Sequence, residues 1–204
     1  MTPKQLFFSL LVRPSLMLLS GIRVKGREHL ALTGPAIIVA NHNSHLDTMA
    51  LLSLFELNRI DRVRPVAAGD YFLATPLKKF ISEKLIGILP VDRKKIRKTG
   101  SKHPLHHLSE ALERGEILII FPEGSRGAPG EIKPFKRGFA HLAKAHPNVP
   151  VIPVKIRGTD RALPKDEALW VPFIIDIRVE NPYYFEGDVR DFTKKIEELF
   201  HDDR

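Results

Sequence analysis

Two runs of apolar residues, AIIVA at 36–40 and ILIIF at 117–121, constrain the fold of this chain most strongly. Neither run alternates with polar residues, which is the pattern of strands that helices cover on both faces. They predict strands over 35–40 and 117–121. Further strands are predicted over 63–68, 149–156 and 173–179, and weaker signals occur at 22–25 and 88–91.

Longer stretches with helical periodicity separate these strands. Helices are predicted over 46–57, 75–85, 105–114, 139–145 and 190–200. Alternation of strands and helices indicates an α/β fold with a mostly parallel or mixed sheet flanked by helices. A length of 204 residues fits a single domain, and 27% charged residues is an ordinary globular composition.

The first 22 residues contain two apolar pieces, 6–12 and 15–22, which Arg13 and Pro14 separate. Neither piece reaches the roughly 20 residues that a membrane-spanning helix needs. The pattern of a signal peptide is also missing. Two alternatives follow: a segment that lies on a membrane surface, or a helix that packs on the core.

The amino-acid composition excludes several kinds of site and favours one kind of binding partner. The chain has no cysteine, which excludes disulfides, thiolate metal sites and a cysteine nucleophile. Its net charge of +8 favours an acidic partner such as nucleic acid, anionic lipid or a phosphorylated substrate. A basic stretch lacks interleaved aromatic residues, which argues against single-stranded nucleic acid as the partner. It consists of Lys94, Lys95, Arg97, Lys98 and Lys102.

His42 and Asp47 follow the strand at 35–40 directly, and ligands gather at such carboxyl ends of strands. An Asp at this spacing can accept a hydrogen bond from one imidazole nitrogen and leave the other to take a proton from a substrate hydroxyl. The alternative is a capping box with Ser44, in which Asp47 only satisfies backbone amides of the next helix. The spacing leaves both interpretations open.

The segment 121–127, FPEGSRG, follows the strand at 117–121 in the same way. Its glycines let backbone amides approach an anion, and Arg126 can bind a phosphate through two parallel hydrogen bonds. Glu123 can orient Arg126 or accept from a substrate hydroxyl. The alternative is a tight polar turn in which Glu123 and Arg126 pair on the surface. Glu at 123 excludes a Gly-x-Ser-x-Gly nucleophile elbow.

Two further segments give weaker indications of a functional site. Arg93 follows the short apolar run at 87–91 and is a candidate for a phosphate site. His103, His107 and Glu110 share one helix face, so a metal site there is conceivable, although a solvated surface face is the simpler interpretation.

Four of these segments together resemble the glycerolipid acyltransferases. Asn41-His42 with Asp47 resembles their NHxxxxD motif, and 121–127 resembles their FPEG(S/T)R block. The segments 87–93 and 149–154 resemble the second and fourth blocks, in the right order. The resemblance implies that His42 is the general base and that Asp47 orients it. It also implies that the acceptor phosphate is held by Glu123, Gly124, Ser125 and Arg126, together with Arg93.

The resemblance implies an enzyme that moves a fatty acyl group to the hydroxyl of lysophosphatidate and so forms phosphatidate. The donor is acyl-CoA or acyl-acyl-carrier protein. Its thioester is already activated, so no metal or further cofactor is expected. Family members often carry Lys where Ala68 stands here, which leaves another lysophospholipid or a lyso-ornithine lipid open as the acceptor. A metal-dependent hydrolase built on His42, His45 and Asp47 and a non-catalytic basic module are the rival functions.

The resemblance also favours a membrane-associating segment at 1–22, before an acyltransferase domain at 23–204. The expected partner is the phospholipid surface at the cytoplasmic face of the cell membrane, with the protein peripheral or monotopic. No nucleic acid is expected to bind.

Overall fold

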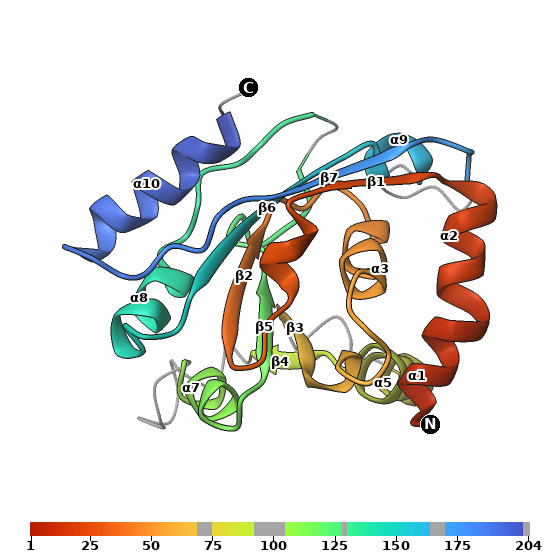
Figure 1. Cartoon of the computed structure of the whole chain (residues 1–204), viewed down its shortest axis with the longest axis horizontal. Coiled ribbons are helices and arrows are strands. Elements are labelled where there is room, and N and C mark those ends of the chain that lie inside the picture. Colours follow the sequence, from red (N-terminus) through yellow and green to blue (C-terminus); the bar gives the residue numbers. More distant parts are fainter. Residues whose placement is uncertain (69–74, 92–104, 128–129, 164–169, 202–204) are drawn as a thin grey trace.

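A seven-stranded sheet forms the centre of the protein, in the order β1-β7-β6-β2-β5-β3-β4 (Figure 1). The computed structural model describes residues 1–68, 75–91, 105–127, 130–163 and 170–201. All seven predicted strands are confirmed, with ends that differ by two residues or fewer from the predictions. They are β1 Ile22–Lys25, β2 Ala36–Ala40, β3 Val63–Ala68, β4 Leu89–Val91, β5 Ile117–Ile120, β6 Val151–Arg157 and β7 Ile175–Val179.

The sheet is mixed but mostly parallel. β2 lies at its centre and pairs in parallel with both β5 and β6. β6 and β7 are antiparallel, because the chain returns directly beside β6 after the short helix α9, Thr159–Ala162. In the β2–β5 register Val39 lies opposite Ile120, so the two strands end almost level. The polar loops that follow them therefore leave the sheet at the same edge.

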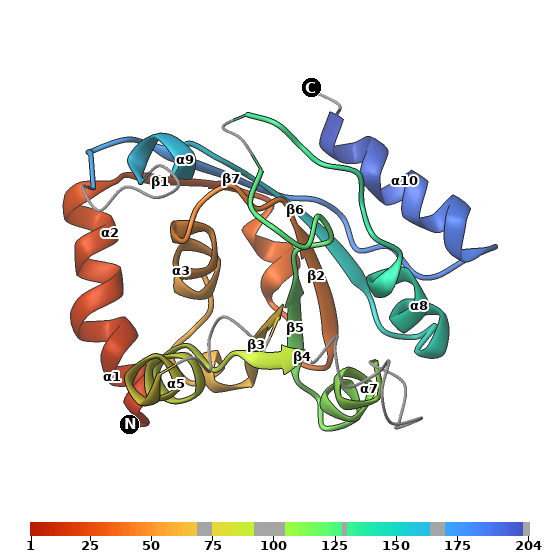
Figure 2. The same cartoon turned by 180° about the vertical axis from the view of Figure 1, so that it is seen from behind.

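Helices cover both faces of the sheet (Figures 1 and 2). One face carries the N-terminal helices, α3 and α5, and the other carries α7, α8 and α10. The helices are α1 Pro3–Phe7, α2 Arg13–Leu19, α3 Leu46–Ser53, α5 Pro76–Phe80, α7 His106–Glu113, α8 Gly138–Ala145 and α10 Val189–His201. Short 3-10 turns span Arg27–Leu30 and Ile60–Arg62, and π-helical turns span Phe8–Val12 and Ile81–Ile86.

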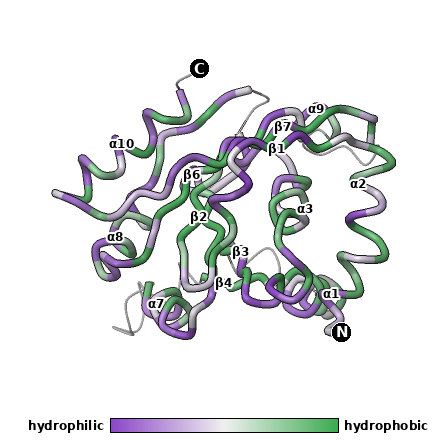
Figure 3. Tube along the Cα trace, viewed as in Figure 1, coloured by the Kyte–Doolittle hydropathy of each residue, from purple (hydrophilic) through white to green (hydrophobic). Residues whose placement is uncertain are grey.

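The burial of β2 explains its unbroken apolar run. All five residues of this strand are inaccessible to solvent. Ile38 packs into the cluster beneath α3, whereas Ile37 and Val39 pack into the cluster beneath α8 and α10. Figure 3 shows the hydrophobic colour continuing through these central strands. Two helix predictions differ in extent: the helix over 46–57 ends at Ser53, and that over 75–85 changes from α to π geometry at Ile81.

The N-terminal segment is one helical rod rather than two separate pieces. A proline inside a helix cannot donate a hydrogen bond and crowds the preceding turn. Here a π-helical turn, Phe8–Val12, precedes Pro14, and the Arg13 amide donates to the carbonyl of Phe8. The rod therefore continues into α2. Within the described residues, no helix is long and apolar enough to cross a membrane.

This rod has two different faces. Phe8, Val12 and Leu16 are buried in the core, as expected for a helix that packs on the domain. On the other side Met17 and Leu18 are 82% and 83% exposed. The packed-helix alternative thus describes one face of the segment and leaves an apolar face uncovered.

Lys4 fixes the start of the rod to the sheet. Its ammonium is buried and donates to the carbonyl of Val63 over 2.7 Å. Gly87 makes room for it, because a Cβ at this position would lie 2.9 Å from Lys4 Nζ. Burial, helped by the nearby charge of Arg64, lowers the pKa of Lys4 to about 7.

The lowered pKa predicts a specific dependence of stability on pH. The unfolded chain keeps the Lys4 proton up to its ordinary pKa of 10.5, whereas the folded protein releases it near 7. Stability should therefore rise with pH between about 7 and 10.5, at up to about 1.4 kcal/mol per unit from this group. Urea unfolding of wild type and Lys4→Met across this window measures the difference in slope. An unchanged difference between the two proteins at every pH would contradict it, and Lys144→Met, at an exposed position of α8, is the control.

Candidate active site

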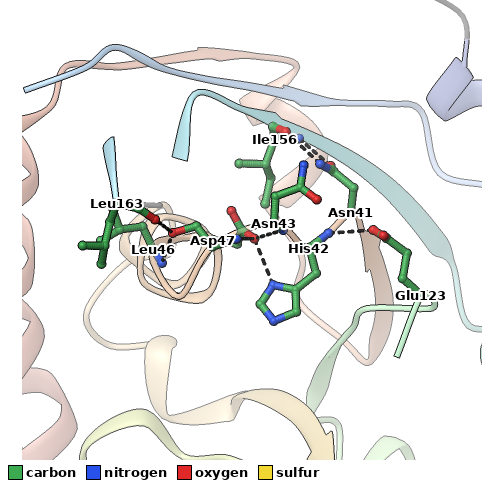
Figure 4. Close-up of polar contacts among 9 residues, drawn as sticks. Asn41, His42, Asn43, Leu46, Asp47, Glu123, Ile156 and Leu163 are labelled. Carbon is green, nitrogen blue, oxygen red and sulfur yellow. Dashed lines mark hydrogen bonds and ion pairs between the residues drawn. The ribbon is translucent and has the colours of Figure 1, made fainter. Parts of the chain in front are cut away.

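The candidate site lies in the two loops that follow β2 and β5 (Figure 4). Asn41 closes the end of β2. Its side-chain amide donates to the carbonyl of Ile156 and accepts from the amide of the same residue, both over 2.8 Å. This pair of bonds extends the contact between β2 and β6 into the loop, so the loop leaves the sheet from a fixed point.

Asp47 organises the loop. Its Oδ2 accepts from His42 Nδ1 over 2.9 Å, from the Asn43 amide over 2.7 Å and from the Ser44 amide over 2.8 Å. The carboxylate is fully buried at the start of α3, where the helix dipole favours its negative charge. The same oxygen therefore holds the imidazole and satisfies two backbone amides of the loop, which precede α3 and are not amides of the helix that the capping-box alternative predicted.

This arrangement fixes the tautomer of His42. An ionised carboxylate only accepts, so Nδ1 carries the proton and Nε2 keeps its lone pair. The side chain is 19% exposed, and Nε2 makes no hydrogen bond within the described part of the chain. Phe121 stacks on the ring with centroids 4.1 Å apart and planes 20° apart. His42 is thus held in one orientation with a basic nitrogen available.

Glu123 joins the two loops. Its Oε1 accepts from the His42 amide over 2.8 Å (Figure 4). Its Oε2 accepts from the Lys133 amide over 3.2 Å. The residue is only 3% exposed, and burial raises the pKa of its carboxyl group, against the opposing effect of these two bonds. The alternative of a surface pair between Glu123 and Arg126 is wrong, since the carboxylate is buried and bound to backbone amides.

The turn at 121–127 is tightly packed against the His42 loop. The Gly127 amide donates to the carbonyl of His42 over 3.0 Å. A Cβ at Gly127 would lie 2.9 Å from the carbonyl oxygen of Glu131 and 3.2 Å from Asn43 Oδ1, so only glycine fits. Gly124 has a φ of 75°, which also favours glycine. Arg126 is half-buried and forms no ion pair within the described residues.

The structure brings most of the predicted site residues to one edge of the sheet. These are His42, Asp47, Glu123, Gly124, Ser125 and Arg126. Arg93, His103 and the basic stretch at 94–102 lie outside the described residues. On α7, His106 and His107 each approach Glu110 to 3.3 Å. In the described ranges, no group of three or more His, Asp or Glu side chains is placed to hold a metal ion.

Sequence reasoning missed three residues that shape the site. Asn41 and Phe121 belong to the recognised motifs, but their roles became visible only in the hydrogen bonds to Ile156 and the stacking on His42. Lys133 lies outside every motif, and no local pattern pointed to it.

The sequence is similar to proteins of one known family. The family model described as Acyltransferase matches residues 21–157. The 1-acyl-sn-glycerol-3-phosphate acyltransferase alpha of Mus musculus is 32% identical over 174 residues, which cover 83% of this chain and 58% of that protein. The human protein of the same name is 29% identical over 173 residues, with 83% and 58% covered. This chain therefore spans little more than half the length of these relatives.

A solved structure shares the fold. The 1-acyl-sn-glycerophosphate (LPA) acyltransferase PlsC from Thermotoga maritima superposes with a TM-score of 0.75 and covers 97% of this chain and 77% of its own. The two sequences are 23% identical. At this identity the likeness establishes the architecture.

Proposed function

The chain belongs to the acyltransferase family, and from this premise we propose that it acylates the free hydroxyl of lysophosphatidate to form phosphatidate. The acyl donor is a thioester, either acyl-CoA or acyl-acyl-carrier protein. One observation carries the proposal: Asp47 Oδ2 lies 2.9 Å from His42 Nδ1, an arrangement that favours the proton at Nδ1 and leaves Nε2 free to act as a base. The names of the relatives, 1-acyl-sn-glycerol-3-phosphate acyltransferases, support the choice of acceptor.

In the proposed reaction, His42 takes up one proton and later returns it. The acceptor hydroxyl gives its proton to His42 Nε2 as its oxygen attacks the thioester carbonyl. Asp47 stabilises the resulting imidazolium through the bond at Nδ1. When the tetrahedral intermediate collapses, the carbon–sulfur bond breaks and Nε2 returns the proton to the departing thiolate. An ester and a free thiol result, and the enzyme returns to its starting state.

The turn at 121–127 is the proposed site of the acceptor phosphate. Arg126 carries a charge that no described acidic residue neutralises, and guanidinium groups bind phosphate through two parallel hydrogen bonds. Ser125 adds a hydroxyl to the same turn, and Gly124 shapes the turn, with its own amide donating to the carbonyl of Phe121 over 3.0 Å. Arg93 is proposed as a second cation. Glu123 contributes by positioning, because its oxygens are engaged by the amides of His42 and Lys133.

Ala68 is the reason for proposing an alternative acceptor substrate. This residue ends β3 at the position where many glycerolipid acyltransferases carry Lys, and its methyl group offers no charge to a phosphate. The same chemistry on another lysophospholipid or on a lyso-ornithine lipid is the alternative.

We further propose that the apolar face of the N-terminal rod rests on a phospholipid membrane, where such acceptors reside. Residues exposed on this face share large apolar side chains, and α1 contacts the π-helical turn that continues α5. The face of the rod consists of Leu10, Leu11, Met17 and Leu18, and the neighbouring α5 also exposes Leu77 and Phe80. The net charge of +8 suits an anionic surface.

Arg126→Ala tests the proposed acceptor. Wild type, purified and assayed in lipid vesicles with both donors, should form phosphatidate from lysophosphatidate. The variant should show a KM for this acceptor raised by about tenfold or more, the loss expected for a charge-assisted bond, and a change below about twofold with monoacylglycerol. Arg190→Ala, at the start of α10, is the matched control. Equal losses with both acceptors would remove Arg126 from the phosphate site, and exclusive acylation of another lyso lipid would establish the alternative.

The proposed contact between the N-terminal rod and the membrane can be tested by vesicle binding. Replacement of Leu10, Met17 and Leu18 by Ser should weaken co-sedimentation with vesicles of phosphatidylcholine and phosphatidylglycerol by more than about tenfold, since each side chain removed from lipid costs about 1.5–3 kcal/mol. These residues are outside the core, so the melting temperature should stay close to that of wild type. Tyr184→Ser, at a residue 51% exposed elsewhere, is the control. Undiminished vesicle binding would contradict the proposal.

A further inference from the structure

Lys133 contacts both halves of the site although it belongs to no motif. Its backbone amide donates to Glu123 Oε2 over 3.2 Å. Its ammonium donates to Ser125 Oγ over 3.3 Å and to the carbonyl of Arg126 over 3.0 Å. One residue thus supports the carboxylate that holds the His42 loop and also fixes the turn that presents Arg126.

The ammonium of Lys133 makes no direct bond to a carboxylate within the described residues, although its charge acts to lower the pKa of the nearby Glu123 carboxyl group, which burial raises. Both of its bonds go to uncharged oxygens, and Lys133 forms no ion pair within the described residues. An ammonium group has three N–H donors, so one remains after these two bonds. Arg126, on the same turn, also lacks an ion pair in this part of the chain. A phosphate bound at this turn would be attracted by the positive charges of both Arg126 and Lys133.

Ordering of this lysine also has a cost. A lysine side chain loses about 2 kcal/mol of rotamer freedom when it is fixed, and two bonds to neutral acceptors at a half-exposed position recover only part of this. This cost is offset if the ordered ammonium group binds an anionic ligand. A lysine that only closed a surface turn would be replaceable by any residue that keeps the turn.

We propose that Lys133 is a positioning and specificity-determining residue for the acceptor phosphate. Its ammonium holds the Ser125–Arg126 turn with two N–H groups and directs the third toward a phosphate oxygen bound by Arg126. The proposal rests on the proposed function, in which this turn receives a phosphorylated lyso lipid. It predicts that Lys133 contributes to the preference for phosphorylated over unphosphorylated acceptors.

The test compares two acceptors that differ only in the phosphate, lysophosphatidate and 1-monoacylglycerol. Lys133→Met keeps the length and removes the charge. It should raise the KM for lysophosphatidate about tenfold while kcat stays within about threefold, because one charge-assisted bond is lost. The KM for monoacylglycerol should change by less than about twofold. Lys133→Arg should keep most of the preference for the phosphorylated acceptor, and Lys144→Met, at an exposed position of α8, should behave as wild type.

The outcomes separate the two proposals. Equal losses with both acceptors would show a lysine that only supports the turn, and no change with either would show that it is dispensable; both results overturn the inference alone. Loss of the preference in Lys133→Arg to the same degree as in Lys133→Met would contradict the role of the charge. A wild type that does not acylate lysophosphatidate would overturn the proposed function and this inference with it.

Discussion

The three hydrogen bonds that converge on Asp47 Oδ2 are the interaction on which the site depends. A buried carboxylate is costly unless several donors compensate it. Here the donors are two amides of the loop and the imidazole of His42. Loop conformation and imidazole orientation are consequently set by the same atom, and a change that disturbs one also disturbs the other. Because Nδ1 is bound to Asp47, Nε2 is the nitrogen that remains available for a proton.

The parallel pairing of β2 and β5 brings the second half of the site to this centre. Strands that end level place their following loops side by side, and Glu123 then bonds to the amide of His42. Gly127 permits the close contact because no side chain fits between the loops. The distance between the base and the proposed phosphate site is therefore set by the bond from the Gly127 amide to the His42 carbonyl and by the buried carboxylate of Glu123.

The sequence predicted the sheet well and the site only in part. Strands such as β2 were predictable because burial on both faces demands an unbroken apolar run. The π-helical turn before Pro14 was not, because it depends on how the rod packs as well as on the proline. His42 and Asp47 could be paired from their spacing. The partners of Glu123 could not, since they are backbone amides, one of which belongs to Lys133, ten residues further along the chain.

The central claim is that His42, held by Asp47, takes the proton from the acceptor hydroxyl. The most direct measurement is acyl transfer by purified His42→Ala beside wild type, in lipid, with each donor. Loss of a general base should reduce turnover by about a hundredfold or more. His107→Ala removes an imidazole that is 72% exposed on α7 and should leave turnover unchanged. Turnover by His42→Ala within a few-fold of wild type would contradict the mechanism.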